Sequence, residues 1–155
     1  MSEPERIVDQ LRRAMEGQAW HGPALRELLQ GVSSEIAAAK PIHGAHSIWE
    51  ILLHITAWTE AVRRRLQGEW AQLSLEEDWP TIDETSEAAW NTALDRLQQV
   101  HQHLLRDVAQ LLPTQLDEPI GQDSLSVYVT LHGLVQHHLY HAGQIALLKR
   151  AASRA

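Results

Sequence analysis

Cysteine and phenylalanine are absent from this chain of 155 residues, and positive charge is scarce, since 13 Lys and Arg stand against 20 Asp and Glu, for a net charge of −7. The lack of cysteine excludes disulfides, thiolate metal sites and cysteine nucleophiles, and it favours a reducing interior. The negative balance makes nucleic acid an unexpected partner, because phosphate backbones repel it. These absences leave an acidic protein without thiol chemistry of its own.

Long apolar runs are also missing. No stretch approaches the roughly 20 residues that a membrane-spanning helix needs, so no membrane partner is expected. The first six residues, MSEPER, are polar and lack the apolar core of a signal peptide. Together with the absence of cysteine, this predicts a cytoplasmic protein.

What is present is typical of a globular domain, with 44% hydrophobic and 21% charged residues. The length is enough for one hydrophobic core, and neither a linker nor an internal repeat divides it, so a single domain over residues 1–155 is predicted. Two counts are unusual, ten histidines and six tryptophans. The histidines carry most of the functional argument.

Most of the sequence has the three-and-four spacing of apolar residues that predicts amphipathic helices. Long helices are predicted over residues 3–16, 47–67, 84–112 and 124–151, with a short one near 25–31. Ser2 with Glu5 and Ser47 with Glu50 form capping boxes at two of the starts. The connection over 68–83 is long enough for the next helix to begin at the same end of a bundle as the one before it. Four such helices without strand-like alternation predict an all-α four-helix bundle.

Two histidines of the last predicted helix lie on its inward face. At 100° per residue, His137 and His141 fall within about 60° of Leu134, on the apolar stripe. One turn apart, with Cβ atoms about 5–6 Å from each other, they can both reach one metal ion. His138 lies close to the same stripe and is a competing partner for His141. The spacing alone leaves both pairings open.

A third donor is offered by the second long helix. His54 lies at the flank of the apolar arc formed by Ile51, Ile55 and Trp58, and a bundle can bring it opposite the histidines of the last helix. Catalytic zinc sites commonly have three protein ligands and one open position. A single histidine on an apolar stripe is also a common core residue, so the metal site depends on whether the three converge. Three neutral imidazoles in one core without a metal would be costly.

Two segments resemble the DinB-like (DinB/YfiT) superfamily. Residues 46–58, HSIWEILLHITAW, resemble its second helix, and residues 140–145, YHAGQI, preceded by His137, resemble its fourth. Residues 20–23, WHGP, also occur in one branch. The resemblance spans nearly the whole chain. It implies a bundle in up-down-down-up order with a long connection between the second and third helices, and a divalent metal ion bound by His54, His137 and His141.

The resemblance also carries functional expectations. The family contains metal-dependent transferases that use low-molecular-weight bacterial thiols, a maleylpyruvate isomerase and hydrolase-like members, and dimers are common in it. We therefore expect a metal-dependent transferase or hydrolase with a small-molecule substrate, such as a low-molecular-weight thiol, and a homodimer. The alternative is a non-enzymatic metal-binding protein of the stress response or a structural bundle. One divalent ion per subunit is expected, zinc or nickel before iron, copper or manganese.

The sequence leaves the roles of several other residues open. Glu50 and Gln144 are spaced to orient a metal-binding histidine, although the capping box already accounts for Glu50. His21 could line a pocket, and the loop residues His43 and His46 could extend the mouth of the site. His101 and His103 are predicted to be surface residues. The sequence contains none of the motifs HExxH, a duplicated ExxH, a Gly-rich phosphate loop or GxSxG, so no catalytic residue is assigned.

Overall fold

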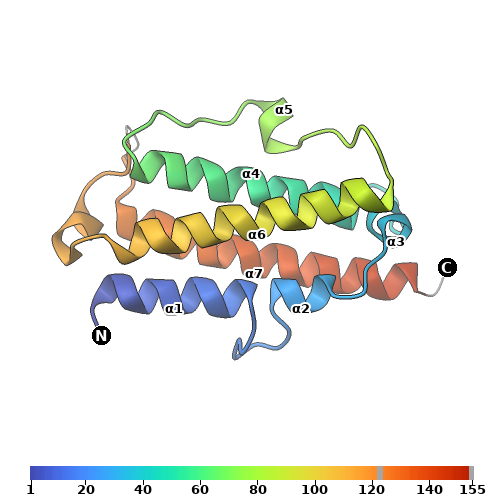
Figure 1. The fold of residues 1–155 in the computed structure, drawn as a ribbon, viewed down its shortest axis with the longest axis horizontal. Coiled ribbons are helices and arrows are strands. Elements are labelled where there is room, and N and C mark those ends of the chain that lie inside the picture. The colour runs from blue at the N-terminus through green and yellow to red at the C-terminus, as the bar shows by residue number, and fades with distance from the viewer. Residues whose placement is uncertain (122–123, 154–155) are drawn as a thin grey trace.

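Four long helices form the bundle in the computed structural model, which describes residues 1–121 and 124–153 (Figure 1). They are α1 (Glu3–Met15), α4 (Ile48–Leu66), α6 (Glu87–Ala109) and α7 (Val127–Ala152). The shorter elements are α2 (Leu25–Leu29), α3 (Ser34–Ala38), α5 (Leu75–Asp78) and the 3-10 helix η1 (Pro113–Asp117). Within these ranges no helix is long and apolar enough to cross a membrane. The predicted all-α four-helix class is confirmed.

The direction of the helices follows from the colour gradient in Figure 1. α1 and α7 run one way along the bundle, and α4 and α6 run the other way, which is an up-down-down-up order. The segment between α4 and α6 passes along the outside of the bundle and carries α5 over α4. This crossover segment, residues 67–86, is the long connection that the sequence indicated, and it proves central to the site.

Serine caps determine where the helices begin. Ser47 Oγ accepts a hydrogen bond from the backbone N–H of Glu50, whose carboxylate accepts from the backbone N–H of Ser47. The two later long helices start at residues 87 and 127, three residues after their predicted starts at 84 and 124, because Ser86 and Ser126 accept from the N–H groups three positions on. A cap satisfies an orphan donor of the first turn, so its position outweighs the apolar periodicity upstream.

The core consists of two apolar clusters with a polar layer between them. One cluster includes Trp49, Leu52, Ile55, Trp90 and Ile145, and the other includes Ile7, Leu11, Val62, Leu104 and Leu131. On α4, α6 and α7 the buried polar side chains lie at or near the boundary between the two clusters along the helix. They are His54, Thr56, Thr59, His101, His138 and His141. Such a layer requires partners for its polar atoms.

His101 corrects the sequence interpretation. It was predicted at the surface and has no exposed area at all. The reason is its spacing, because Leu97, His101, Leu104 and Val108 follow one another at four, three and four residues, which places His101 on the inward stripe of α6. Its neighbour His103, on another face, is partly exposed.

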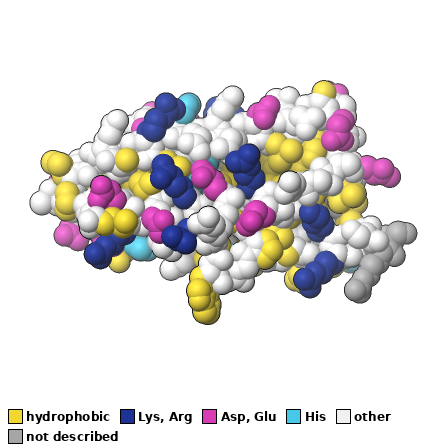
Figure 2. Space-filling view, turned by 60° about the horizontal axis from the view of Figure 1, so that its bottom comes forward, with side chains coloured by type: hydrophobic (Ala, Val, Ile, Leu, Met, Phe, Trp, Pro, Cys, Tyr) yellow, Lys and Arg dark blue, Asp and Glu magenta, His cyan; other side chains and the backbone are white. Residues whose placement is uncertain are grey.

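On the face of the molecule shown in Figure 2, basic and acidic side chains are interspersed, with no extended basic patch.

Candidate metal centre

Three histidine nitrogens converge where α4 and α7 pack against each other. Nε2 of His137 lies 3.0 Å from Nε2 of His54 and 3.1 Å from Nε2 of His141. The ligand atoms of the three residues all lie within 4.8 Å of one another. The structure thus brings together the three histidines predicted from the sequence. This group, called the cluster from here on, could hold a metal ion.

Asp78 offers two oxygen atoms to Nδ1 of His54. Nδ1 of His54 lies 2.7 Å from the main-chain oxygen of Asp78 and 3.0 Å from its carboxylate Oδ1. Both oxygens are acceptors, so Nδ1 is the donor, and in the neutral ring the lone pair is on Nε2. That lone pair is directed toward the other two histidines.

Gln144 plays the same part for His141. Its Oε1 lies 2.7 Å from Nδ1 of His141 and accepts a hydrogen bond from it. Nε2 of His141 therefore also presents a lone pair to the cluster. This contact agrees with the orienting role suggested by the three-residue spacing of His141 and Gln144.

The protonation pattern of the cluster suits a cation. Two Nε2 lone pairs point at Nε2 of His137, which can carry at most one proton. Nδ1 of His137 is buried without a hydrogen-bond partner, so either tautomer of this ring leaves a buried polar atom unsatisfied. An ion bound by three Nε2 atoms would remove the conflict between the lone pairs. The residues present therefore fit a three-nitrogen metal site.

The pKa values point the same way. Burial first, and then the neighbouring His141 and His54, lower the pKa of His137 to about 4. Burial also lowers the pKa of His141, against an opposing effect of the hydrogen bond to Gln144. Both rings are thereby kept neutral at physiological pH, and the neutral ring is the form that binds metals.

Aromatic rings surround the three histidines. Trp79, next to Asp78, stacks on His54 with ring centroids 4.0 Å apart and an interplanar angle of 8°. His46 stacks on the same indole at 3.6 Å and 7°. Trp58 donates from Nε1 to Oδ1 of Asp78 at 2.6 Å. Residues 78 and 79 of the crossover segment thus hold the outer side of His54. Sequence analysis missed them because they lie in an irregular connection whose position on α4 is a tertiary feature.

The competing residues lie elsewhere. His138 is fully buried, but its Nε2 is 3.2 Å from Oγ1 of Thr59, so it belongs to the core rather than to the cluster. Burial lowers its pKa to about 3. Glu50 is engaged by its cap and by Nζ of Lys40 at 2.8 Å. His43 is exposed. The capping explanation for Glu50 is therefore the one that its contacts favour.

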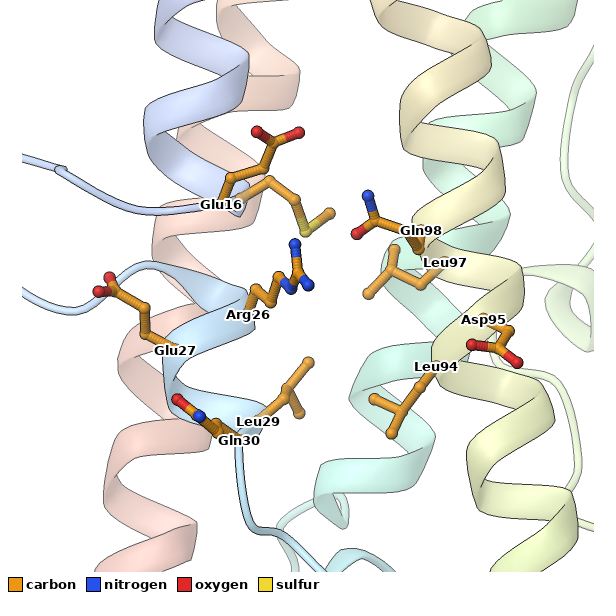
Figure 3. Close-up of a pocket in the computed structure, with 10 residues that line it drawn as sticks. Glu16, Arg26, Glu27, Leu29, Gln30, Leu94, Asp95, Leu97 and Gln98 are labelled. Atoms are coloured by element: carbon orange, nitrogen blue, oxygen red, sulfur yellow. The ribbon is translucent and has the colours of Figure 1, made fainter.

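Two surface cavities lie away from the three histidines. His21 lines one of about 530 Å³ between α1 and α7, together with Trp20, Val135 and Leu139. Figure 3 shows another, of about 480 Å³, between the α1–α2 junction and α6, where Arg26 and Gln98 point over an apolar floor that includes Leu29 and Leu97. Neither cavity is lined by a member of the cluster. His54 and His141 are buried, with 6% and 5% exposed, and His137 is partly exposed.

The similarity of this chain to known proteins is at the level of a family. Neither a curated protein nor a solved structure shows significant similarity to the chain. A family model described as the DinB superfamily matches residues 19–145, a range that includes all three histidines of the cluster. The match covers most of the 155 residues. The chain therefore belongs to the DinB superfamily.

Proposed function

We propose that this protein binds one divalent metal ion per chain through Nε2 of His54, His137 and His141. The proposal rests on the convergence of these three nitrogens. Asp78 and Gln144 accept from the far nitrogens of His54 and His141 and so orient two of the three rings. Zinc and nickel are the ions we propose first, and imidazole nitrogen suits both. Iron, copper and manganese are the weaker candidates.

We further propose that the protein is an enzyme that transfers a low-molecular-weight thiol. The described residues supply a group of three metal-ligating side chains at this place, which leaves a coordination position for a small molecule. A bound divalent ion lowers the pKa of a thiol or water and polarises an electrophile. Oδ1 of the nearby Asp78 is engaged by Trp58 and His54, so this oxygen is not free to act as a general base. A thiol activated by the ion needs no such base, which favours it over water as the nucleophile.

Cobalt substitution tests the thiol proposal. A low-molecular-weight bacterial thiol added to the cobalt-loaded protein is expected to produce a sulfur-to-cobalt charge-transfer band. The chain has no cysteine, so no side chain can produce this band. Coupling of the thiol to a chlorinated aromatic electrophile should then run faster than with free thiol and free metal.

The variant His54→Ala provides the control for the spectrum, since it should lose both the ion and the band. If cobalt loads into the wild type and no thiol changes its spectrum, the transferase proposal is wrong. Turnover of esters or amides by the zinc form would then favour a hydrolase. Its absence would favour a metal-binding protein of the stress response without an enzymatic role.

We also propose that the protein forms a homodimer through the outer face of α7. No charged residue occurs from Val127 to Leu148, and the side chains of Val129, Tyr140 and Leu147 are 49%, 67% and 61% exposed. A surface helix normally carries charged residues on its outer face, and this stretch of α7 carries none. Since each chain has a net charge of −7, two copies repel each other least where this uncharged face meets its own counterpart.

Val129 and Leu147 lie five turns apart on the same side of α7 and test the dimer. The double variant Val129→Glu, Leu147→Glu should be monomeric in light scattering coupled to size exclusion, whereas the wild type should have twice the mass of the chain. Leu112→Glu, at another exposed apolar position, should remain dimeric. A monomeric wild type would disprove the proposal.

A further inference from the structure

Asp78 is the one residue of the crossover segment that makes two polar contacts with a histidine of the cluster. Its main-chain oxygen and its Oδ1 lie 2.7 and 3.0 Å from Nδ1 of His54. The same Oδ1 accepts the indole N–H of Trp58 at 2.6 Å. The carboxylate is thus fixed between two side chains of α4, although Asp78 itself is 24 residues further along the chain than His54.

Local sequence places Asp78 at this point. Ser74 and Glu77 form a capping box, in which Ser74 Oγ accepts from the N–H of Glu77 at 3.3 Å and the Glu77 carboxylate accepts from the N–H of Ser74 at 2.8 Å. This box starts the single turn of α5, and Asp78 is its last residue. Trp79 follows and stacks on the imidazole of His54. The turn therefore brings a carboxylate, a carbonyl and an indole to one ring.

We propose that Asp78 is a positioning residue of the metal centre, which holds the proton of His54 on Nδ1 and turns Nε2 toward His137 and His141. The inference rests on the metal-binding function proposed above. A carboxylate that accepts from the far nitrogen of a metal-binding histidine fixes its tautomer and makes the ligating nitrogen more basic, and loss of such a partner typically costs about 10–100-fold in metal affinity. The crossover segment therefore contributes to metal affinity without supplying a ligand.

The variant Asp78→Asn removes the charge of the carboxylate and keeps the size and shape of the side chain, so it tests the carboxylate without disturbing the fold. Asparagine keeps an oxygen where Oδ1 lies, and the main-chain oxygen of residue 78 also stays, so Trp58 and His54 keep their acceptors. Neutral oxygens, however, attract the proton on Nδ1 of His54 less strongly than a carboxylate does. We expect a loss of about 10–100-fold in zinc affinity, measured by competition with a chromophoric chelator. The matched control is Asp83→Asn, in the same segment, where the exposed carboxylate accepts from the hydroxyl of Thr81 at 3.3 Å and, among the described residues, does not contact the histidine cluster. Its affinity should equal that of the wild type, and circular dichroism of both variants checks the fold.

Nitrogen-15 NMR of the metal-free protein gives a second readout that a merely structural role would not change. The wild type and Asp83→Asn should show His54 protonated on Nδ1, and Asp78→Asn should shift the population toward Nε2. Equal zinc affinity of Asp78→Asn and the wild type would overturn the proposal. If the wild type binds neither zinc nor nickel, the metal-binding function fails, and the tautomer then decides: an unchanged His54 tautomer in Asp78→Asn overturns the positioning role, and a shifted one supports it.

Discussion

Replacing His141 by alanine should abolish stoichiometric metal binding, whereas replacing His103 should leave about one divalent ion per chain. This result is expected because His141 supplies one of three nitrogens that lie within 4.8 Å of one another. Two imidazoles on neighbouring helices hold a zinc or nickel ion far less tightly than three, since each ligand contributes to an affinity that also supports folding. The measurement is elemental analysis after dialysis of protein purified without a histidine tag, which would itself bind metal.

His103→Ala is a suitable control because His103 is partly exposed and lies outside the cluster. The variant His138→Ala addresses the competing pairing in the last helix. It should keep its metal, since His138 contacts Thr59 rather than the cluster, even though loss of a fully buried side chain lowers its stability. Equal metal content of His141→Ala and the wild type would contradict the assignment, and loss of metal in His138→Ala alone would move the site by one position.

The helices of the bundle could be predicted because their determinants are local. Capping boxes such as Ser47 with Glu50, and apolar residues every three or four positions, depend on residues within one or two turns. The starts of α6 and α7 were predicted three residues early because Ser86 and Ser126 were not recognised as caps. An N-cap is a single serine among many, and only its hydrogen bond to the third residue of the helix identifies it.

The candidate site divides in the same way. His137 and His141 share one stripe of one helix, so their proximity follows from helical geometry, and the family resemblance adds His54 from a helix that a bundle brings opposite them. Asp78 and Trp79 could not be found from periodicity, because they lie in the crossover segment and reach His54 only through the tertiary path of that segment. The sequence therefore predicts the ligating histidines but not Asp78 and Trp79, which orient His54.

His101 could have been predicted, and its misassignment is instructive. His101 and His103 lie two apart, which shows that they occupy different faces of the helix but not which of them faces inward. The four-three-four spacing from Leu97 to Val108 answers that question. A buried histidine without hydrogen bonds on either ring nitrogen lowers the stability of the fold.

Without metal, the protein should lose stability steeply as the pH falls from about 6.5 toward 4. Burial lowers the pKa of His101 from 6.5 to about 4, with a smaller contribution from Arg12. Its nearest carboxylate, Oε1 of Glu16, is 3.6 Å from Nε2, beyond hydrogen-bonding distance. Between these two pH values the unfolded chain binds a proton at this histidine and the folded chain does not, so acid favours unfolding. The loss from His101 is about 2 kcal/mol at pH 5 and is absent above pH 7.

The variant His101→Leu isolates this contribution. Leucine has no proton to bind and no polar atom to satisfy, so the stability at pH 7.5 should be equal to that of the wild type or higher, and the loss between pH 7.5 and pH 5 should shrink by about 2 kcal/mol. Urea unfolding in the presence of a chelator measures both values. A residual loss is expected in the variant, because burial also lowers the pKa of His137 and His138. His103→Leu, at a partly exposed position of the same helix, should keep the wild-type dependence on pH. If His101→Leu keeps it as well, His101 is not held neutral by burial, and its place in the polar layer must be supported by a partner that binds the charged ring.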